Sequence, residues 1–117
     1  MAEIIDDNSM LNVGTVLKNT YRIERHLSSG GFGNTYIAKT IEFGDIVAIK
    51  EFYISGINGR DNYSRTVTVS ITNKPFFSGQ LEKFKKEARR LRSINHDNIV
   101  RVHDLFEENG TAYYVLL

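Results

Sequence analysis

Glycines gathered within residues 30–33 separate two runs that alternate like β-strands, and this interruption constrains the fold more than any other feature. The run before the glycines spans residues 21–27 and the run after them spans 35–39. A third extended run, 46–53, is rich in β-branched residues and follows a hairpin turn at 43–45. Because tight turns join neighbouring strands antiparallel, the sequence predicts an antiparallel sheet that begins with these three strands.

The remainder of the chain predicts one helix and two more strands. Helical spacing follows Pro75 and predicts a helix over residues 78–94. The apolar stripe of this helix consists of Leu81, Phe84, Ala88 and Leu91. Two further strands are expected at 99–106 and 111–117. The predicted fold is therefore α+β, with a five-stranded antiparallel sheet and the single main helix packed on one face.

The segment 55–75, between the third strand and the helix, has a different character. Its first part is rich in Gly, Asn and Asp and predicts a loop, whereas residues 66–72 alternate valine and isoleucine with threonine and serine. That alternation predicts an inserted strand or hairpin arm, to which the sequence assigns no chemical role.

The glycine-rich hairpin has two interpretations. Backbone N–H groups that no side chain obstructs can close over phosphate oxygens, or the loop is only a flexible hairpin with Phe32 at its tip. Two other phosphate-binding motifs are excluded. A dinucleotide fingerprint needs its glycines to open a helix, and a Walker A loop needs Lys-Ser or Lys-Thr where Asn34 and Thr35 follow Gly33.

Two charged residues, Lys50 and Glu87, lie beside predicted apolar surfaces. Lys50 ends a strand run and shares a face with Ala48, so its amine either reaches water or meets an anion. Glu87 lies at the rim of the helical stripe. Its partners are either Lys83 and Arg90 on its own helix or Lys50 across the sheet, and periodicity alone leaves both alternatives open.

Composition narrows the classes of function. The 117 residues accommodate one domain, a formal net charge of +1 gives no reason to expect a nucleic-acid partner, and the absence of cysteine excludes disulfides and thiolate sites. His26, His96 and His103 have no metal-ligand spacing, so we expect them to be structural or surface residues and expect no metal site. No apolar run approaches the roughly 20 residues that span a bilayer, and the N-terminus is acidic, so we expect a cytoplasmic location.

Five motifs in series resemble those of the N-terminal lobe (N-lobe) of a protein kinase, in particular of bacterial serine/threonine kinases of the eukaryotic-like type. The motifs are LSSGGFGNTY at 27–36, VAIK at 47–50, FKKE at 84–87, HDNIV at 96–100 and YYVL at 113–116. Residues 1–12 have no sustained period and many polar groups, which predicts a flexible lead-in. The resemblance implies that residues 13–117 are the N-lobe of an incomplete kinase domain that lacks the C-lobe. It also implies that the 55–75 segment is inserted between strand 3 and the helix.

The resemblance implies a role for each matching position. Lys50 matches the lysine that contacts the α- and β-phosphates of ATP, and Glu87 matches the helix glutamate that positions this lysine, so these two form the catalytic pair. Ala48 matches the residue against the adenine, and Leu116 matches the gatekeeper at the back of the pocket. The implied nucleotide-binding set is Leu27, Ser28, Ser29, Gly30, Gly31, Phe32, Gly33, Thr35, Ala48, Lys50 and Leu116.

Two positions depart from the family pattern. Ser28 stands where the family has the first glycine of its loop, and Thr35 stands where many kinases have valine against the adenine. Ser28 is compatible with a nucleotide-binding hairpin, and neither departure implies a dead enzyme.

The longer parent protein is expected to transfer the γ-phosphoryl group of ATP, with Mg²⁺, to protein Ser/Thr hydroxyls. The catalytic-loop Asp and Asn and the Mg²⁺-binding Asp of the family match nothing in these 117 residues, so we expect this chain alone to be inactive. The alternative is a stand-alone N-lobe-like module that binds or scaffolds without catalysis. Self-association is also expected, through the surface that a C-lobe would bury or by pairing of the last strand. Any membrane segment of the parent is expected further towards its C-terminus.

Overall fold

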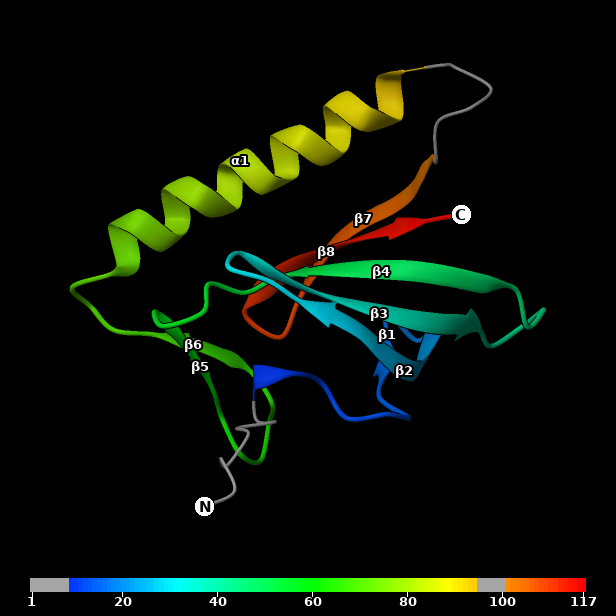
Figure 1. Ribbon diagram of the computed structural model, residues 1–117, viewed down its shortest axis with the longest axis horizontal. Coiled ribbons are helices and arrows are strands. Elements are labelled where there is room, and N and C mark those ends of the chain that lie inside the picture. Colours follow the sequence, from blue (N-terminus) through cyan, green and yellow to red (C-terminus); the bar gives the residue numbers. More distant parts are fainter. Residues whose placement is uncertain (1–8, 95–100) are drawn as a thin grey trace.

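The computed structural model describes residues 9–94 and 101–117, which form one curled antiparallel sheet, a small second sheet and a long helix (Figure 1). The elements are β1 (Val16–Leu17), β2 (Tyr21–Ser29), β3 (Gly33–Thr40), β4 (Ile46–Phe52), β5 (Asn58–Arg60), β6 (Val67–Val69), α1 (Lys74–Ser93), β7 (Val102–Glu108) and β8 (Thr111–Leu116). The large sheet has the order β1-β2-β3-β4-β8-β7, and β5 pairs with β6 apart from it. The predicted α+β architecture is confirmed.

The large sheet contains the five expected strands and one more. β2, β3, β4, β7 and β8 are the predicted strands, and the two-residue β1 pairs antiparallel with β2 at the edge of the sheet. The hairpin β5–β6 lies in the inserted segment. Its second strand, β6, falls within residues 66–72, where the alternation predicted a strand or hairpin arm. β7 begins at Val102, and the predicted start of this strand at residue 99 lies outside the described residues. Strand β8 lies between β4 and β7 in the order of the sheet, so the last strand is not an edge and the expected self-association by its pairing is wrong.

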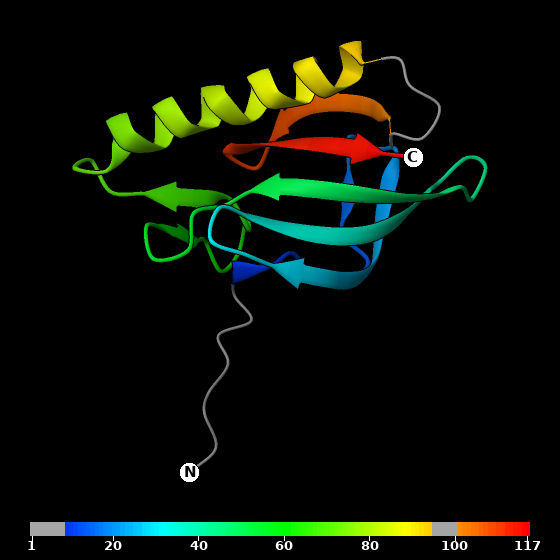
Figure 2. The same ribbon diagram turned by 45° about the horizontal axis from the view of Figure 1, so that its top comes forward.

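Helix α1 begins earlier than the sequence suggested. It starts at Lys74 rather than Ser78 and includes Pro75 in its first turn. Proline is accepted there because the first N–H groups of a helix have no intrahelical acceptor to lose. The predicted apolar stripe is confirmed, since Ala88 is fully buried and the other members are partly buried against the sheet. Figure 2 shows α1 lying along β7 and β8. No helix of the described residues has the length and apolarity that crossing a membrane requires.

The sheet separates two sets of side chains by the alternation of its strands. One core, inside the curl, contains Leu17, Ile23, Tyr36, Ile49 and Val115, all fully buried. The opposite face carries Phe52 of β4 and Tyr114 of β8, whose rings pack against Phe84 of α1. Because side chains of a strand point alternately to its two faces, β4 contributes to the core with every second residue and to the α1 side with the others.

The end of the predicted lead-in belongs to the folded part of the chain. Leu11 is fully buried, and its N–H donates to the Tyr36 hydroxyl at 2.9 Å. Residues 1–8 lie outside the described residues. Met10 and Leu11 therefore contribute to the core, although the predicted lead-in included them.

Polar contacts join the two edges of the large sheet. Lys18, just after β1, places its amine 2.8 Å from the Asp104 carboxylate of β7, and the Tyr21 hydroxyl of β2 donates to the same carboxylate at 2.8 Å. The Lys18 N–H donates to Glu108 at 2.9 Å. The curl of the sheet is thus closed by hydrogen bonds from Lys18 and from β2 to β7, the strand at the opposite edge of the sheet.

We expect Asp104→Asn to lower the free energy of unfolding by about 1 kcal/mol at neutral pH, a modest value because the half-exposed Lys18 is screened by solvent. Partial burial raises the pKa of Asp104, but the hydrogen bonds from Lys18 and Tyr21 outweigh it and hold this pKa below its usual value. A depressed carboxyl pKa stabilises the fold above the unfolded-state pKa of about 4, and this stability is lost as pH falls through the folded-state pKa. Urea unfolding at neutral and at acid pH measures the difference; a gap that persists undiminished at about pH 2 would contradict the assignment.

Candidate functional site

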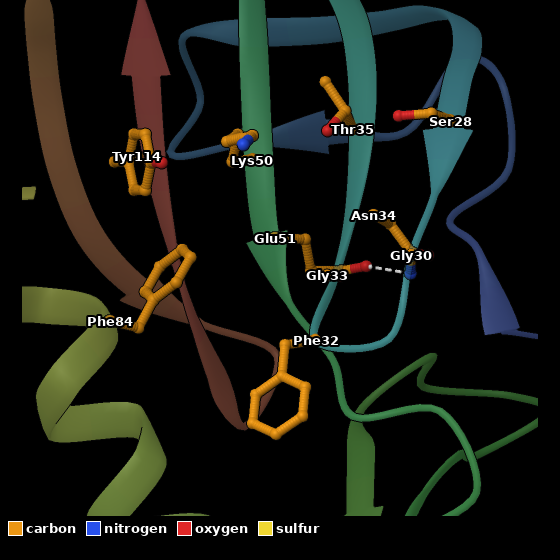
Figure 3. A pocket seen from close by; sticks show the side chains of 10 residues that line it. All are labelled: Ser28, Gly30, Phe32, Gly33, Asn34, Thr35, Lys50, Glu51, Phe84 and Tyr114. Atoms are coloured by element: carbon orange, nitrogen blue, oxygen red, sulfur yellow. Dashed lines mark hydrogen bonds between the residues drawn. The ribbon is translucent and has the colours of Figure 1, made fainter. Parts of the chain in front are cut away.

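A pocket of about 340 Å³ opens beside the glycine-rich loop, on the face of β4 that carries Lys50. Its lining residues are Ser28, Gly30, Phe32, Gly33, Asn34, Thr35, Lys50, Glu51, Phe84 and Tyr114 (Figure 3). They come from β2, the loop, β3, β4, α1 and β8, so the pocket gathers segments that are far apart in the sequence.

The pocket brings together half of the residues that the resemblance singled out. The shared members are Ser28, Gly30, Phe32, Gly33, Thr35 and Lys50. Ala48 and Leu116 lie outside the lining but are directly opposite one another on β4 and β8, one pleat further from the loop than Lys50. Leu27 is half exposed on β2. Ser29 pairs with Asn34 at the base of the loop, and Gly31 lies near its tip.

The glycine-rich loop is closed by backbone hydrogen bonds. The Gly30 N–H donates to the Gly33 carbonyl at 2.8 Å, which forms the turn drawn in Figure 3. Beyond the turn, the carbonyls of Gly31 and Phe32 accept N–H groups from Ser55 and Tyr53 at 2.9 and 3.3 Å. The loop therefore lies against the chain that leaves β4.

Ring contacts at its tip and a close backbone approach at its base hold the loop in place. The Phe32 ring meets Phe52 and Phe76 edge-on, each with ring centres 6.4 Å apart. At the base of the loop, a Cβ on Gly33 would lie 2.8 Å from the Glu51 carbonyl oxygen. Glycine is thus required at this position by the close approach of two strands.

Lys50 lies in the pocket with its side chain exposed and pairs in register with Thr35 and Tyr114. No carboxylate of the described residues lies within ion-pair distance of its amine. A cation without a carboxylate partner among the described residues, in a cavity lined by the glycine-rich loop, suits an anionic ligand.

Glu87 has a partner on its own helix. Arg90 places Nη2 at 2.7 Å and Nε at 3.0 Å from the two carboxylate oxygens, and this hydrogen bonding holds the pKa of Glu87 below its usual value. The structure thus shows the local alternative rather than the pairing with Lys50. Phe84 of α1 points at Tyr114, with ring centres 5.0 Å apart, and Tyr114 lies beside Lys50 (Figure 3).

A buried carboxylate, Glu51, lies directly after Lys50 on the core side of β4. Neither the patterns of the sequence nor the resemblance assigned a role to Glu51. Its Oε1 accepts from Arg60 Nη2 at 2.7 Å, from Asn34 Nδ2 at 3.0 Å and from the Tyr36 hydroxyl at 2.7 Å. Its Oε2 accepts from the Tyr113 hydroxyl at 2.6 Å. The signal was present in the sequence: Glu51 shares a face with Val47 and Ile49, where a charge needs buried partners.

Acidic and histidine side chains of the described residues do not form a metal-binding cluster. Within residues 9–94 and 101–117, no three His, Asp or Glu residues lie close enough together to hold a metal ion.

Comparison with known proteins agrees with this geometry, although no protein-family model matches the chain. The serine/threonine-protein kinase pkn2 of Myxococcus xanthus is 31% identical over 101 residues, which are 86% of this chain and 10% of that kinase. PknA of Mycobacterium tuberculosis is 30% identical over 109 residues, with 89% of this chain and 21% of that kinase covered. The solved apo form of PpkA-294 matches with a TM-score of 0.87 and 28% identity over 92% of this chain and 38% of that chain.

The chain is therefore related to the serine/threonine protein kinases, with bacterial kinases among its relatives, and its fold is that of a protein kinase N-lobe. It spans only about a tenth to two fifths of the length of the relatives it matches. The resemblance and the fold class predicted from the five motifs are confirmed.

We expect Gly33→Ala to lower the free energy of unfolding by about 1–3 kcal/mol, because the added methyl group collides with the backbone of Glu51. Gly31→Ala is the matched control, since a Cβ there meets nothing within 4 Å and should change stability by less than about 0.5 kcal/mol. Urea unfolding of the two variants measures both values. Equal effects at the two glycines would contradict the close approach at Gly33.

Proposed function

We propose that this chain is the ATP-binding lobe of a serine/threonine protein kinase. The observation that carries the proposal is the pocket in which Lys50, without an acidic partner among the described residues, faces the hydrogen-bonded glycine loop. Its relation to named serine/threonine kinases supports the same conclusion.

Residues of the pocket and of the strand positions beside it each contact a different part of the nucleotide. The Lys50 amine contacts the α- and β-phosphates, and the glycine-rich loop covers their oxygens. Ala48 and Leu116, opposite each other across β4 and β8, contact the adenine together with Leu27. Glu87 pairs with Lys50 after it exchanges its present partner Arg90. Mg²⁺ supplies charge neutralisation on the phosphates when bound, and its protein ligands lie outside this chain.

The whole protein transfers the γ-phosphoryl group of ATP to Ser/Thr hydroxyls of a protein substrate. This chain alone binds ATP weakly and transfers nothing, because its 117 residues contain neither a His-Arg-Asp nor an Asp-Phe-Gly sequence. Detection of Mg-ATP-dependent phosphorylation by the purified chain would contradict this part of the proposal.

We expect Lys50→Met to weaken ATP binding about tenfold or more, because a charge-assisted contact to phosphate is lost. Adenosine, which has no phosphate, should bind both forms equally. Lys39→Met is the matched control, since Lys39 is an exposed lysine of the neighbouring strand β3 whose amine lies 3.9 Å from Glu24. NMR titration with each ligand measures the affinities, and undiminished ATP binding by Lys50→Met would show that the site is wrong.

Self-association is expected to involve the apolar surface at the ends of β4 and β8, where Ile46 and Leu117 are 66% and 60% exposed. Light scattering should give an apparent mass that rises with concentration and falls back in Leu117→Ser. Tyr63→Ser is the control, because Tyr63 is 97% exposed in the loop between β5 and β6. A single-chain mass at high concentration would contradict the expectation.

A further inference from the structure

The hairpin β5–β6 and the buried pair formed by Arg60 and Glu51 lie outside the positions that the kinase resemblance explains. We propose that Arg60 is a positioning residue for the phosphate-binding part of the pocket and acts through Glu51. This inference rests on the proposed function, because it concerns the same nucleotide site.

The ion pair between Arg60 and Glu51 is completely enclosed. Arg60 Nη2 lies 2.7 Å from Glu51 Oε1, and both side chains have an exposed fraction of 0%. Burial lowers the pKa of Arg60, but the charge and the hydrogen bond of Glu51 outweigh it and the net direction is upward, so the guanidinium stays charged. The Arg60 guanidinium also lies over the Tyr53 ring, 5.3 Å from its centre.

The Glu51 carboxylate joins strands that carry the pocket. Asn34, which follows the last glycine of the loop, donates to it from β3 at 3.0 Å, and Tyr113 donates from β8 at 2.6 Å. Gly33 packs on the Glu51 carbonyl, and Lys50 precedes Glu51 on the same strand. One carboxylate therefore fixes the spacing between the base of the glycine loop and the lysine of the pocket.

Arg60 brings the inserted hairpin to this carboxylate. Its Nη1 donates to the Arg65 carbonyl at 2.9 Å, which closes the turn of the hairpin, and its Nη2 also donates to the Ser9 carbonyl at 2.9 Å. At the other end of the insert, the Ser55 N–H donates to the Gly31 carbonyl near the loop tip. The insert thus contacts the glycine loop directly at its tip and, through Glu51 and Asn34, at its base.

A structural role alone does not account for the choice of residues. A buried ion pair is often no more stabilising than well-packed apolar side chains of the same volume, because both charges lose their hydration. What the pair provides is directed, short hydrogen bonds to several strands at once. In this chain the network lies at the loop end of these strands, next to Gly33 and Lys50, whereas Ala48 and Leu116 lie further along β4 and β8. A fixed geometry at the loop end therefore favours binding of the phosphates more than binding of the adenine.

The test compares ATP with adenosine on the 117-residue chain. Arg60→Met is expected to weaken ATP binding about tenfold and to change adenosine binding by less than about twofold. A variant with a general folding defect would lose both ligands together. The matched control is Arg65→Met in the same hairpin, because Arg65 Nη2 donates to the Met10 carbonyl at 2.6 Å rather than to Glu51; it should keep the wild-type ratio of the two affinities.

Two further variants keep the proposal falsifiable if Arg60→Met does not fold. The double variant Glu51→Gln with Arg60→Met leaves no uncompensated buried charge, and it should show the same selective loss of ATP. Arg60→Lys keeps the charge without the planar fork and should recover part of the ATP affinity. Full ATP affinity in any folded Arg60 variant, or an equal loss of ATP and adenosine, overturns the inference. Failure of the wild-type chain to bind ATP overturns the proposed function itself, so the two failures are distinguishable.

Discussion

The fold depends most on a single buried carboxylate and the donors around it. Glu51 has an exposed fraction of 0%, and its two oxygens accept four hydrogen bonds, from Asn34, Tyr36, Arg60 and Tyr113. An ionised carboxylate in an apolar core is tolerated only when it is paired and hydrogen-bonded. Removal of any one of these donors therefore lowers the stability of the fold. Since they come from β3, β8 and the inserted hairpin and meet on β4, the position of each element constrains the others.

Strand β4 links this network to the pocket through the alternation of its side chains. Glu51 points into the core, while Lys50, its neighbour, points to the face with the pocket. Residues adjacent on a strand point to opposite faces, so the lysine proposed to bind the ligand is held in place by a neighbour whose side chain is buried in the core. The same separation holds on β8, where Tyr113 bonds Glu51 and Tyr114 lines the pocket.

Much of the fold was predictable because it follows from periodic patterns. The alternating runs gave the strands, and the stripe through Ala88 gave the helix face, since both reflect burial on one side. Pro75 misled the prediction of the helix start because proline is accepted in the first turn as well as before it. The partner of Glu87 was undetermined because residues on its own helix and across the sheet are equally compatible with its spacing. Arg60 was missed because its loop-like segment has no period, and only the folded hairpin brings it to Glu51.

The contact between Gly33 and Glu51 has a consequence for motion. Opening a loop requires a place where the backbone can turn, and the base of this loop is wedged against a strand. The tip is held by the hydrogen bonds that the Gly31 and Phe32 carbonyls accept at 2.9 and 3.3 Å and by the two edge-on ring contacts of Phe32. These contacts can break one at a time, whereas the base cannot shift without moving β4, so we expect the loop to open by turning at its base rather than by shifting as a whole.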